Sequence, residues 1–249
     1  LEGSTSENGA RARVCPVVEI TRMKHASKGM SDNIVLKFMN HPQGVEGKLW
    51  KPLFSATLIV ATVYLIWDEL YTQWGVWGFN PEYLQGWYLG NLPIEEICFF
   101  IFVPYACIFV YECLKAYFPY LKFKKLAGVF AFSMSILCLV LSIIYLEKLY
   151  TSVACIVALA LTIWLYYGRK VKWFADFALT FLVIQIPFFF VNGALTGMFT
   201  PEPIVWYNEA EIMGPRWVSI PVEDTIYNYG FLLLVFFFYK KFKKGVKTI

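Results

Sequence analysis

The sequence predicts an all-α membrane protein, a polytopic bundle of about six transmembrane helices, from three observations. Hydrophobic residues make up 58% of the 249 residues and charged residues only 16%, so the chain is far more apolar than an ordinary soluble domain. Six apolar stretches approach the length of about 20 residues that crosses a hydrocarbon core. Lys and Arg gather in alternate connections between these stretches, which is typical of a chain that crosses a membrane repeatedly.

The predicted spans lie at residues 52–71, 94–117, 126–146, 150–167, 173–196 and 221–240. Residues 1–47 differ in kind, because they are mostly small and polar, contain no stretch long enough to span a membrane, and begin without Met. We expect this segment to be a polar N-terminal tail, part of it introduced for expression.

The basic residues predict the orientation of the chain. If the loops alternate sides, one side carries only Lys148 and Arg216. The other side carries Lys48, Lys51, Lys115, Lys122, Lys124, Lys125, Arg169, Lys170, Lys172, Lys240, Lys241, Lys243, Lys244 and Lys247. The positive-inside rule places that side, with both termini, in the cytoplasm. We therefore expect a multi-pass protein of the bacterial cytoplasmic membrane, whose net charge of +4 reflects topology and anionic lipid and not a nucleic-acid partner.

Two similar acidic motifs predict an internal repeat. "PIEE" at 93–96 and "PVED" at 221–224 each open an apolar span, and each follows a loop rich in Gly, Trp, Pro and Tyr. Asp68 and Asn192 end the spans before these loops. Four crossings separate the equivalent spans, so the two repeats run in the same direction and open at the same membrane face. We expect a first repeat at 48–125, a connecting helix at 126–147 and a second repeat at 148–249, with the two loops folded over a shared cavity.

The paired acids Glu95 and Glu96, and Glu223 and Asp224, are candidate catalytic residues. Each pair follows a Pro in the first helical turn, where the helix dipole favours ionised carboxylates, although an ordinary helix start has the same pattern. Ionisable groups at the edge of hydrocarbon are costly unless they pair or face a polar cavity. One protonated acid beside an ionised partner would supply a general acid and a general base. The pattern does not show which member of a pair is which.

Further polar and aromatic residues accompany the acids. Asn228 lies four residues after Asp224 on the same helical face, where it would orient that carboxyl or bond a neighbouring helix. The aromatic residues of the two loops either form an interfacial belt or include π-faces that stabilise a carbocation. The candidate substrate-binding residues among them are Trp67, Trp74, Trp77, Trp87, Trp206 and Tyr207.

The sequence lacks the motifs of several other kinds of catalysis. The two histidines, His25 and His41, both lie in the polar tail, and no C-x-x-C pair occurs. We find no G-x-G-x-x-G after a strand, no phosphate-binding loop, no nucleophile elbow and no H-E-x-x-H. We therefore expect acid and base chemistry on an apolar substrate, with no cofactor and no metal.

The stretch "IWDELYTQWGVWGFNPEYLQGWYLGNLPIEEICFF" closely resembles the first half of the membrane-embedded, cofactor-free lycopene β-cyclases, and "PVEDTIYN" resembles the motif of their second half. The resemblance covers about residues 48–240. Its most specific part is the loop supplied here by Asp68, Thr72, Gly75, Val76, Trp77, Phe79, Asn80 and Pro81. Fused members of that family carry another apolar helix before the first span found here, and we expect none within residues 1–47.

The resemblance implies an isomerase of carotenoid biosynthesis that converts lycopene to γ-carotene and then β-carotene. A proton added to the terminal double bond creates a cation, a neighbouring double bond closes the ring, and a different proton leaves. The resemblance also implies that Glu95, Glu96, Glu223 and Asp224 transfer protons, supported by Asp68, Asn192 and Asn228. The expected partners are lycopene, other carotenoids and membrane lipid, and a homo-oligomer is left open.

Two alternatives remain at this point. One is another carotenoid end-group cyclase, of the one-ring or ε type, because the ring depends on which proton leaves the cation. The other is a proton- or cation-coupled transporter whose acids bind the ion. Transporters usually place polar groups near mid-membrane, whereas the spans at 126–146 and 150–167 contain no Asp, Glu, Lys, Arg or His.

Overall fold

The computed structural model describes residues 46–117 and 124–245. Almost all of the predicted polar tail therefore lies outside the described residues. The chain divides into two units, residues 1–50 and residues 51–249. Only the first residues of helix α2 are described in the first unit, and the second unit contains every other element.

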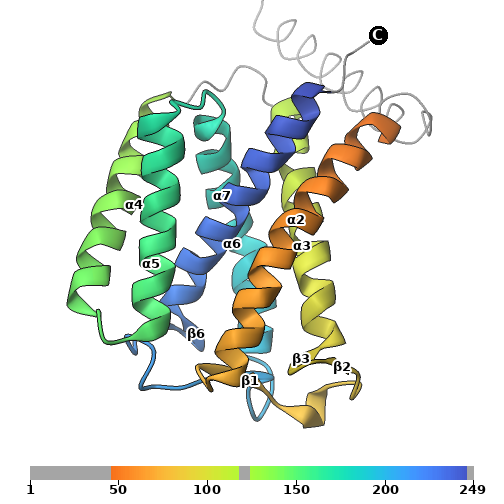
Figure 1. Ribbon diagram of the computed structural model, residues 1–249, viewed down its shortest axis with the longest axis vertical. Helices are drawn as coiled ribbons and strands as arrows, with labels where there is room; N and C mark the ends of the chain where they lie inside the picture. Colours follow the sequence, from red (N-terminus) through yellow and green to blue (C-terminus); the bar gives the residue numbers. More distant parts are fainter. Residues whose placement is uncertain (1–45, 118–123, 246–249) are drawn as a thin grey trace, which may run out of the picture. The chain divides into compact units, whose positions relative to one another are not determined.

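Long helices dominate the described residues (Figure 1). They are α2 (Glu46–Gln73), α3 (Ile94–Tyr117), α4 (Lys124–Ile144), α5 (Leu149–Thr162), which continues as the π-helical segment η2 (Ile163–Gly168), α6 (Phe174–Leu195) and α7 (Val222–Gly245). Within the described ranges, five stretches are long and apolar enough to cross a membrane: Trp50–Gln73, Ile94–Lys115, Lys125–Ile144, Leu149–Gly168 and Phe174–Leu195. These stretches begin and end within a few residues of five predicted spans and confirm a multi-pass helical bundle.

Helix α7, the sixth predicted span, differs from the others in composition. It is 24 residues long but carries Glu223 and Asp224 in its first turn and Lys243 and Lys244 in its last. Its middle is nevertheless deeply buried, and Leu232, Leu233 and Val235 have no exposed surface. Contacts with α3, α5 and α6 explain this burial.

Small residues bring α5 close to α7. Ala154 and Ala158 lie one turn apart on α5, and both are buried. On α7, a Cβ added to Gly230 would lie 3.9 Å from the Ala158 Cα atom. Small residues at such a contact allow two helix backbones to approach, as is common in membrane bundles. The start of α5 is consequently held beside the start of α7, where the second acidic motif lies.

The short strands gather at one end of the second unit, which we call the loop end (Figure 1). There β1 (Trp77–Phe79) pairs antiparallel with β4 (Val205–Tyr207), so that Trp77 lies opposite Tyr207. Strand β1 belongs to the loop before the first acidic motif and β4 to the loop before the second. This pairing confirms the prediction that the two loops meet.

A small hairpin precedes each acidic helix. Strands β2 (Tyr88–Leu89) and β3 (Leu92–Pro93) form the first hairpin, and β5 (Arg216–Trp217) and β6 (Ile220–Pro221) form the second. Both turns contain two residues, and both begin with a residue at positive φ, Gly90 at 66° and Val218 at 60°. Each hairpin ends in a buried Pro, so it fixes the point at which the acidic helix begins.

Candidate active site

One cavity at the loop end is lined by residues of both halves of the second unit. Its aromatic wall consists of Trp77, Phe79, Phe99, Phe100, Tyr150, Phe188, Tyr207, Tyr227 and Phe231. Its polar residues are Asp68, Glu96, Asn192, Asp224 and Asn228, all of them predicted from the sequence. The two acidic motifs therefore contribute to a single site, which we call the acid cavity.

Asp224 is the most extensively hydrogen-bonded carboxyl of the acid cavity. The Tyr150 hydroxyl donates to its Oδ1 atom at 2.7 Å. The Asn192 amide and the Tyr207 hydroxyl donate to its Oδ2 atom at 2.7 Å and 2.8 Å. These donors come from α5, α6 and β4, so three separate elements converge on one side chain that is only 6% exposed. Three donors around one carboxyl group favour its ionised form.

Tyr207 remains a donor over the whole physiological pH range. Desolvation at the cavity wall, followed by the charge of the neighbouring Asp224, raises the pKa of the Tyr207 phenol well above its usual value of about 10. The phenol therefore keeps its proton and directs it toward Asp224.

Asp68 has a contrasting environment at the end of α2. It is 3% exposed, and its Oδ1 atom accepts a 2.6 Å hydrogen bond from the Trp77 indole. Its Oδ2 atom is buried and has no partner among the described residues. Glu96 lines the same cavity from the first turn of α3 and is only partly buried. The first half of the site thus supplies two carboxyl groups, and among the described residues one hydrogen-bond donor, the Trp77 indole, reaches this pair.

Glu95 and Glu223, the first acids of each pair, do not line the acid cavity. The Glu95 carboxylate accepts a 2.8 Å hydrogen bond from the Gln85 backbone N–H. The Glu223 side chain is fully buried and accepts from the Thr151 hydroxyl at 2.6 Å and from the Met213 backbone N–H at 2.5 Å. Each of these acids therefore holds a backbone segment of the loop that precedes its helix.

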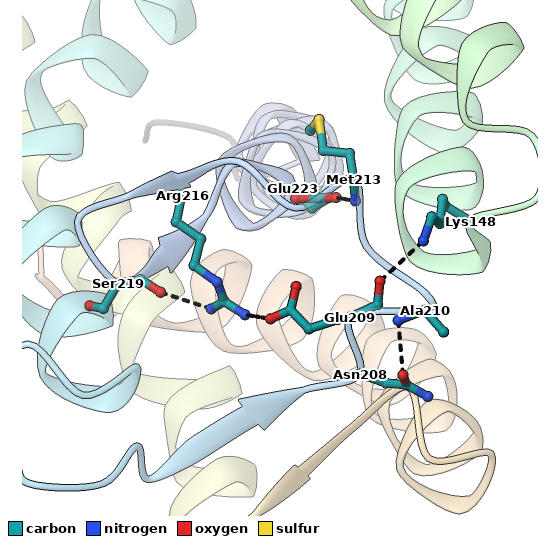
Figure 2. Close-up of polar contacts among 8 residues, drawn as sticks. All are labelled: Lys148, Asn208, Glu209, Ala210, Met213, Arg216, Ser219 and Glu223. Carbon is teal, nitrogen blue, oxygen red and sulfur yellow. Dashed lines mark hydrogen bonds and ion pairs between the residues drawn. The ribbon is translucent and has the colours of Figure 1, made fainter.

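The loop around Glu223 is fixed by further polar contacts, which Figure 2 shows together with the Met213 hydrogen bond. Arg216 forms an ion pair with Glu209 at 2.6 Å and donates to the Ser219 carbonyl at 3.0 Å. Lys148 donates to the Glu209 carbonyl at 3.1 Å and thereby ties the loop to the residue preceding α5. The loop that covers the second acidic motif is consequently held from several directions.

The other predicted residues lie at different distances from the acid cavity. Asn228 lines it and is 7% exposed, and within the described ranges its amide has no hydrogen bond to Asp224. Trp77 and Tyr207 line it directly, whereas Trp67 packs behind Tyr227 with ring centroids 5.0 Å apart. The aromatics Trp74, Trp87 and Trp206 are exposed and do not line it.

Sequence reasoning did not identify Tyr150, Thr151 or Tyr227 as part of the site. Tyr150 and Thr151 begin α5, which has no acidic motif, and they reach Asp224 and Glu223 only through the packing of α5 on α7. One signal was available: with alternating crossings, the predicted span at 150–167 starts at the same membrane face as both acidic motifs.

Comparison with known proteins identifies the family of the chain. A model of the family described as lycopene cyclase matches residues 33–114 and 147–242. No curated protein and no solved structure shows significant similarity to the chain. The two matched segments cover more than half of the chain and include every polar residue of the acid cavity. The chain therefore belongs to the lycopene cyclase family of carotenoid biosynthesis.

Proposed function

We propose that this protein converts lycopene to γ-carotene and then to β-carotene by redox-neutral, acid- and base-catalysed cyclisation of its end groups. One observation carries the proposal. Three carboxyl groups, Asp68, Glu96 and Asp224, line a single aromatic cavity with very different hydrogen-bond environments. A cyclisation needs one group that gives a proton and another that takes one, and unequal environments separate these roles.

Asp224 is the proposed base. Its two oxygen atoms accept three hydrogen bonds, one of them from an Asn192 amide, which can only donate at that nitrogen. Such a carboxylate remains charged inside an apolar wall because each bond to an ionised group is stronger than a neutral one. The same charge stabilises a cation formed nearby.

Asp68 is the proposed acid. A charged carboxylate with a buried, unpartnered oxygen is unstable, whereas a neutral carboxylic acid can place its proton on that oxygen. The Trp77 indole occupies the other oxygen, so the proton on Oδ2 is the one available to a substrate. Glu96 lines the same cavity and is partly exposed, so we assign it the exchange of protons with water that restores both groups: it returns a proton to Asp68 and takes up the one left on Asp224 after each ring closes.

The reaction then proceeds without any change in oxidation state. Asp68 adds its proton to the terminal double bond, and the resulting tertiary cation is attacked by the next double bond to close a six-membered ring. The positive charge moves to a ring carbon, and Asp224 removes a proton from the neighbouring ring carbon to leave the β-ring. The faces of Trp77, Tyr227 and the adjacent phenylalanines support the cation through their π-electrons.

The test uses purified protein in liposomes that contain lycopene, incubated in D₂O. Pigment is separated by chromatography with absorption and mass detection. We expect products with the retention of γ- and β-carotene that have gained one mass unit for each ring, because a deuteron enters and a proton leaves. Unlabelled rings would contradict separate acid and base groups, and unchanged lycopene beside folded protein would contradict the cyclase itself.

A matched pair of variants links the reaction to the acid cavity. Asp224→Asn should reduce conversion by at least about 100-fold, the usual contribution of a positioned base. Asp176→Asn makes the same change in the first turn of α6, away from the acid cavity, and should leave conversion unchanged. Chromatography of the parent's product also separates the β-ring from the ε-ring and one ring from two.

A further inference from the structure

A second hollow, which we call the side groove, adjoins the acid cavity. It is lined by Gln185, Phe188, Phe189, Trp217, Ile220 and Thr225. Three of these residues come from α6, two from the hairpin β5–β6 and one from α7. Its surface is almost entirely apolar, although one of its residues, Phe188, also lines the acid cavity.

Phe188 joins the two hollows because its side chain lines both. On α6 it lies four residues before Asn192, so the two side chains share a helical face. On α7, Thr225 of the side groove directly follows Asp224 of the acid cavity. The side groove therefore starts within one helical turn of the hydrogen bond between Asn192 and Asp224.

The strand pair β1–β4 forms part of the wall of the acid cavity, because Trp77 and Tyr207 of that pair line it. A substrate with a reacting end group in the acid cavity and a long conjugated arm needs an apolar surface along which the arm can extend out of the cavity. That surface has to lie away from the strand pair β1–β4. The side groove provides such a surface from the end of the acid cavity formed by Phe188.

We infer that the side groove is the binding site of the polyene arm of the substrate, while the end group that cyclises occupies the acid cavity. This inference rests on the proposed function. A conjugated polyene is flat and stiff, and the rings of Phe188, Phe189 and Trp217 provide faces against which it packs. Phe188 lies at the boundary between the arm and the end group.

The conformation of the second hairpin supports a role for Trp217. Val218, which follows it, has φ of 60°, a conformation that costs a β-branched residue free energy. Glycine occupies the equivalent place in the first hairpin, where Leu89 is the counterpart of Trp217. The strained turn holds Trp217 at the side groove through its pairing with Ile220, which is buried.

The experiment compares two substrates in liposomes: lycopene and a truncated acyclic terpenoid with the same end group but no long arm. Phe189→Ala and Trp217→Ala remove side chains that line only the side groove. Matched controls are Ile186→Ala, which is 67% exposed on the same helix, and Leu89→Ala, which is 72% exposed in the other hairpin. Half-saturating substrate content and maximal rate are measured separately.

We expect each groove variant to raise the half-saturating lycopene content about tenfold, with its maximal rate within about twofold of the parent. The truncated substrate should be converted by parent and groove variants alike. Equal effects on both substrates, or groove variants that match the controls, would show that lipid or no ligand occupies the side groove. If either alanine variant is poorly folded, Phe189→Leu and Trp217→Leu replace it. A parent protein that converts neither substrate would refute the proposed function. If the parent converts lycopene but the groove variants behave like the controls, only the inference about the side groove is refuted.

Discussion

Trp77 and Tyr207 lie directly opposite each other in the strand pair β1–β4, and each donates a hydrogen bond to a different carboxyl group of the acid cavity. Trp77 donates to Asp68 from the first half of the site, and Tyr207 donates to Asp224 from the second. One two-stranded element thus sets the spacing of two donors on which the proposed acid and base depend.

Adjacent acids should respond differently to the loss of charge. Asp224→Asn should abolish most cyclisation while the protein stays folded, because its three donors surround the proposed base. Glu223→Gln should instead lower the thermal unfolding temperature and change the rate less than tenfold. Its Oε1 atom accepts from Thr151 and Met213, and the net contribution of such a hydrogen bond is about 0.5–1.5 kcal/mol. Unfolding in detergent and pigment conversion measure the two effects, and a reversed pattern would refute this division of roles.

Tyr150→Phe should make Asp224 a less effective base while the aromatic ring continues to fill its place in the wall of the acid cavity. The variant keeps the ring but removes the 2.7 Å hydrogen bond to Asp224. We expect a rate loss of about tenfold, equivalent to about 1.4 kcal/mol, and a share of ε-ring or other isomers, because a less firmly held base can remove a different proton.

Tyr227→Phe is the matched control for this prediction. Its hydroxyl is buried in the same cavity and has no hydrogen-bond partner among the described residues. Removing an unpartnered hydroxyl should leave the unfolding temperature unchanged or raise it. Pigment analysis and thermal unfolding of both variants test the comparison, which fails if Tyr227→Phe loses as much cyclisation rate as Tyr150→Phe.

Val218→Gly should stabilise the protein. The valine side chain is 74% exposed and contributes little packing, while its φ of 60° costs about 1–2 kcal/mol for an ordinary residue. Gly90→Ala should destabilise, because φ is 66° there and the new Cβ would lie 2.9 Å from the Glu69 carboxylate oxygens. Thermal unfolding of the two variants should therefore shift in opposite directions.

Much of the fold was predictable because hydrophobic length alone specifies a membrane span. The stretches Ile94–Lys115 and Phe174–Leu195, for example, start and end within a few residues of their predicted limits. The meeting of the two loops followed from the direction of the repeats and is seen in the pairing of β1 with β4. The composition of α7 shows where this reasoning is weakest, since paired acids and terminal lysines offset its apolar middle.

The different positions of the two acids in each pair could not be predicted from the sequence. Neighbouring residues on a helix point about 100° apart, and α3 is apolar around its whole circumference, so the pattern does not show whether Glu95 or Glu96 faces the interior. The donor from Tyr150 was equally hidden, because it depends on the close packing of α5 against α7 and not on any local motif.

The packing of Tyr64, on α2, against Gly230, on α7, yields a final prediction. A Cβ added there would lie 3.2 Å from the Tyr64 hydroxyl oxygen, which is tighter than most real contacts. Tyr64 has little room to move, since its ring packs against those of Trp67, Phe100, Tyr227 and Phe231 and it is only 2% exposed. Gly230→Ala should therefore destabilise by about 1–3 kcal/mol, the usual cost of overpacking.

Tyr64→Phe should rescue this variant. The Tyr64 hydroxyl is buried without a partner among the described residues, so its removal costs no hydrogen bond and opens space for the new methyl group. The double variant also gains the better helix propensity of Ala over Gly, about 1 kcal/mol. We expect it to unfold at or above the temperature of the parent, with a coupling free energy of about 1 kcal/mol or more in the double-mutant cycle. Additive effects would show that the Tyr64 hydroxyl is not what the new methyl group meets, and that the clash is relieved by a shift of α2, which carries Tyr64, relative to α7.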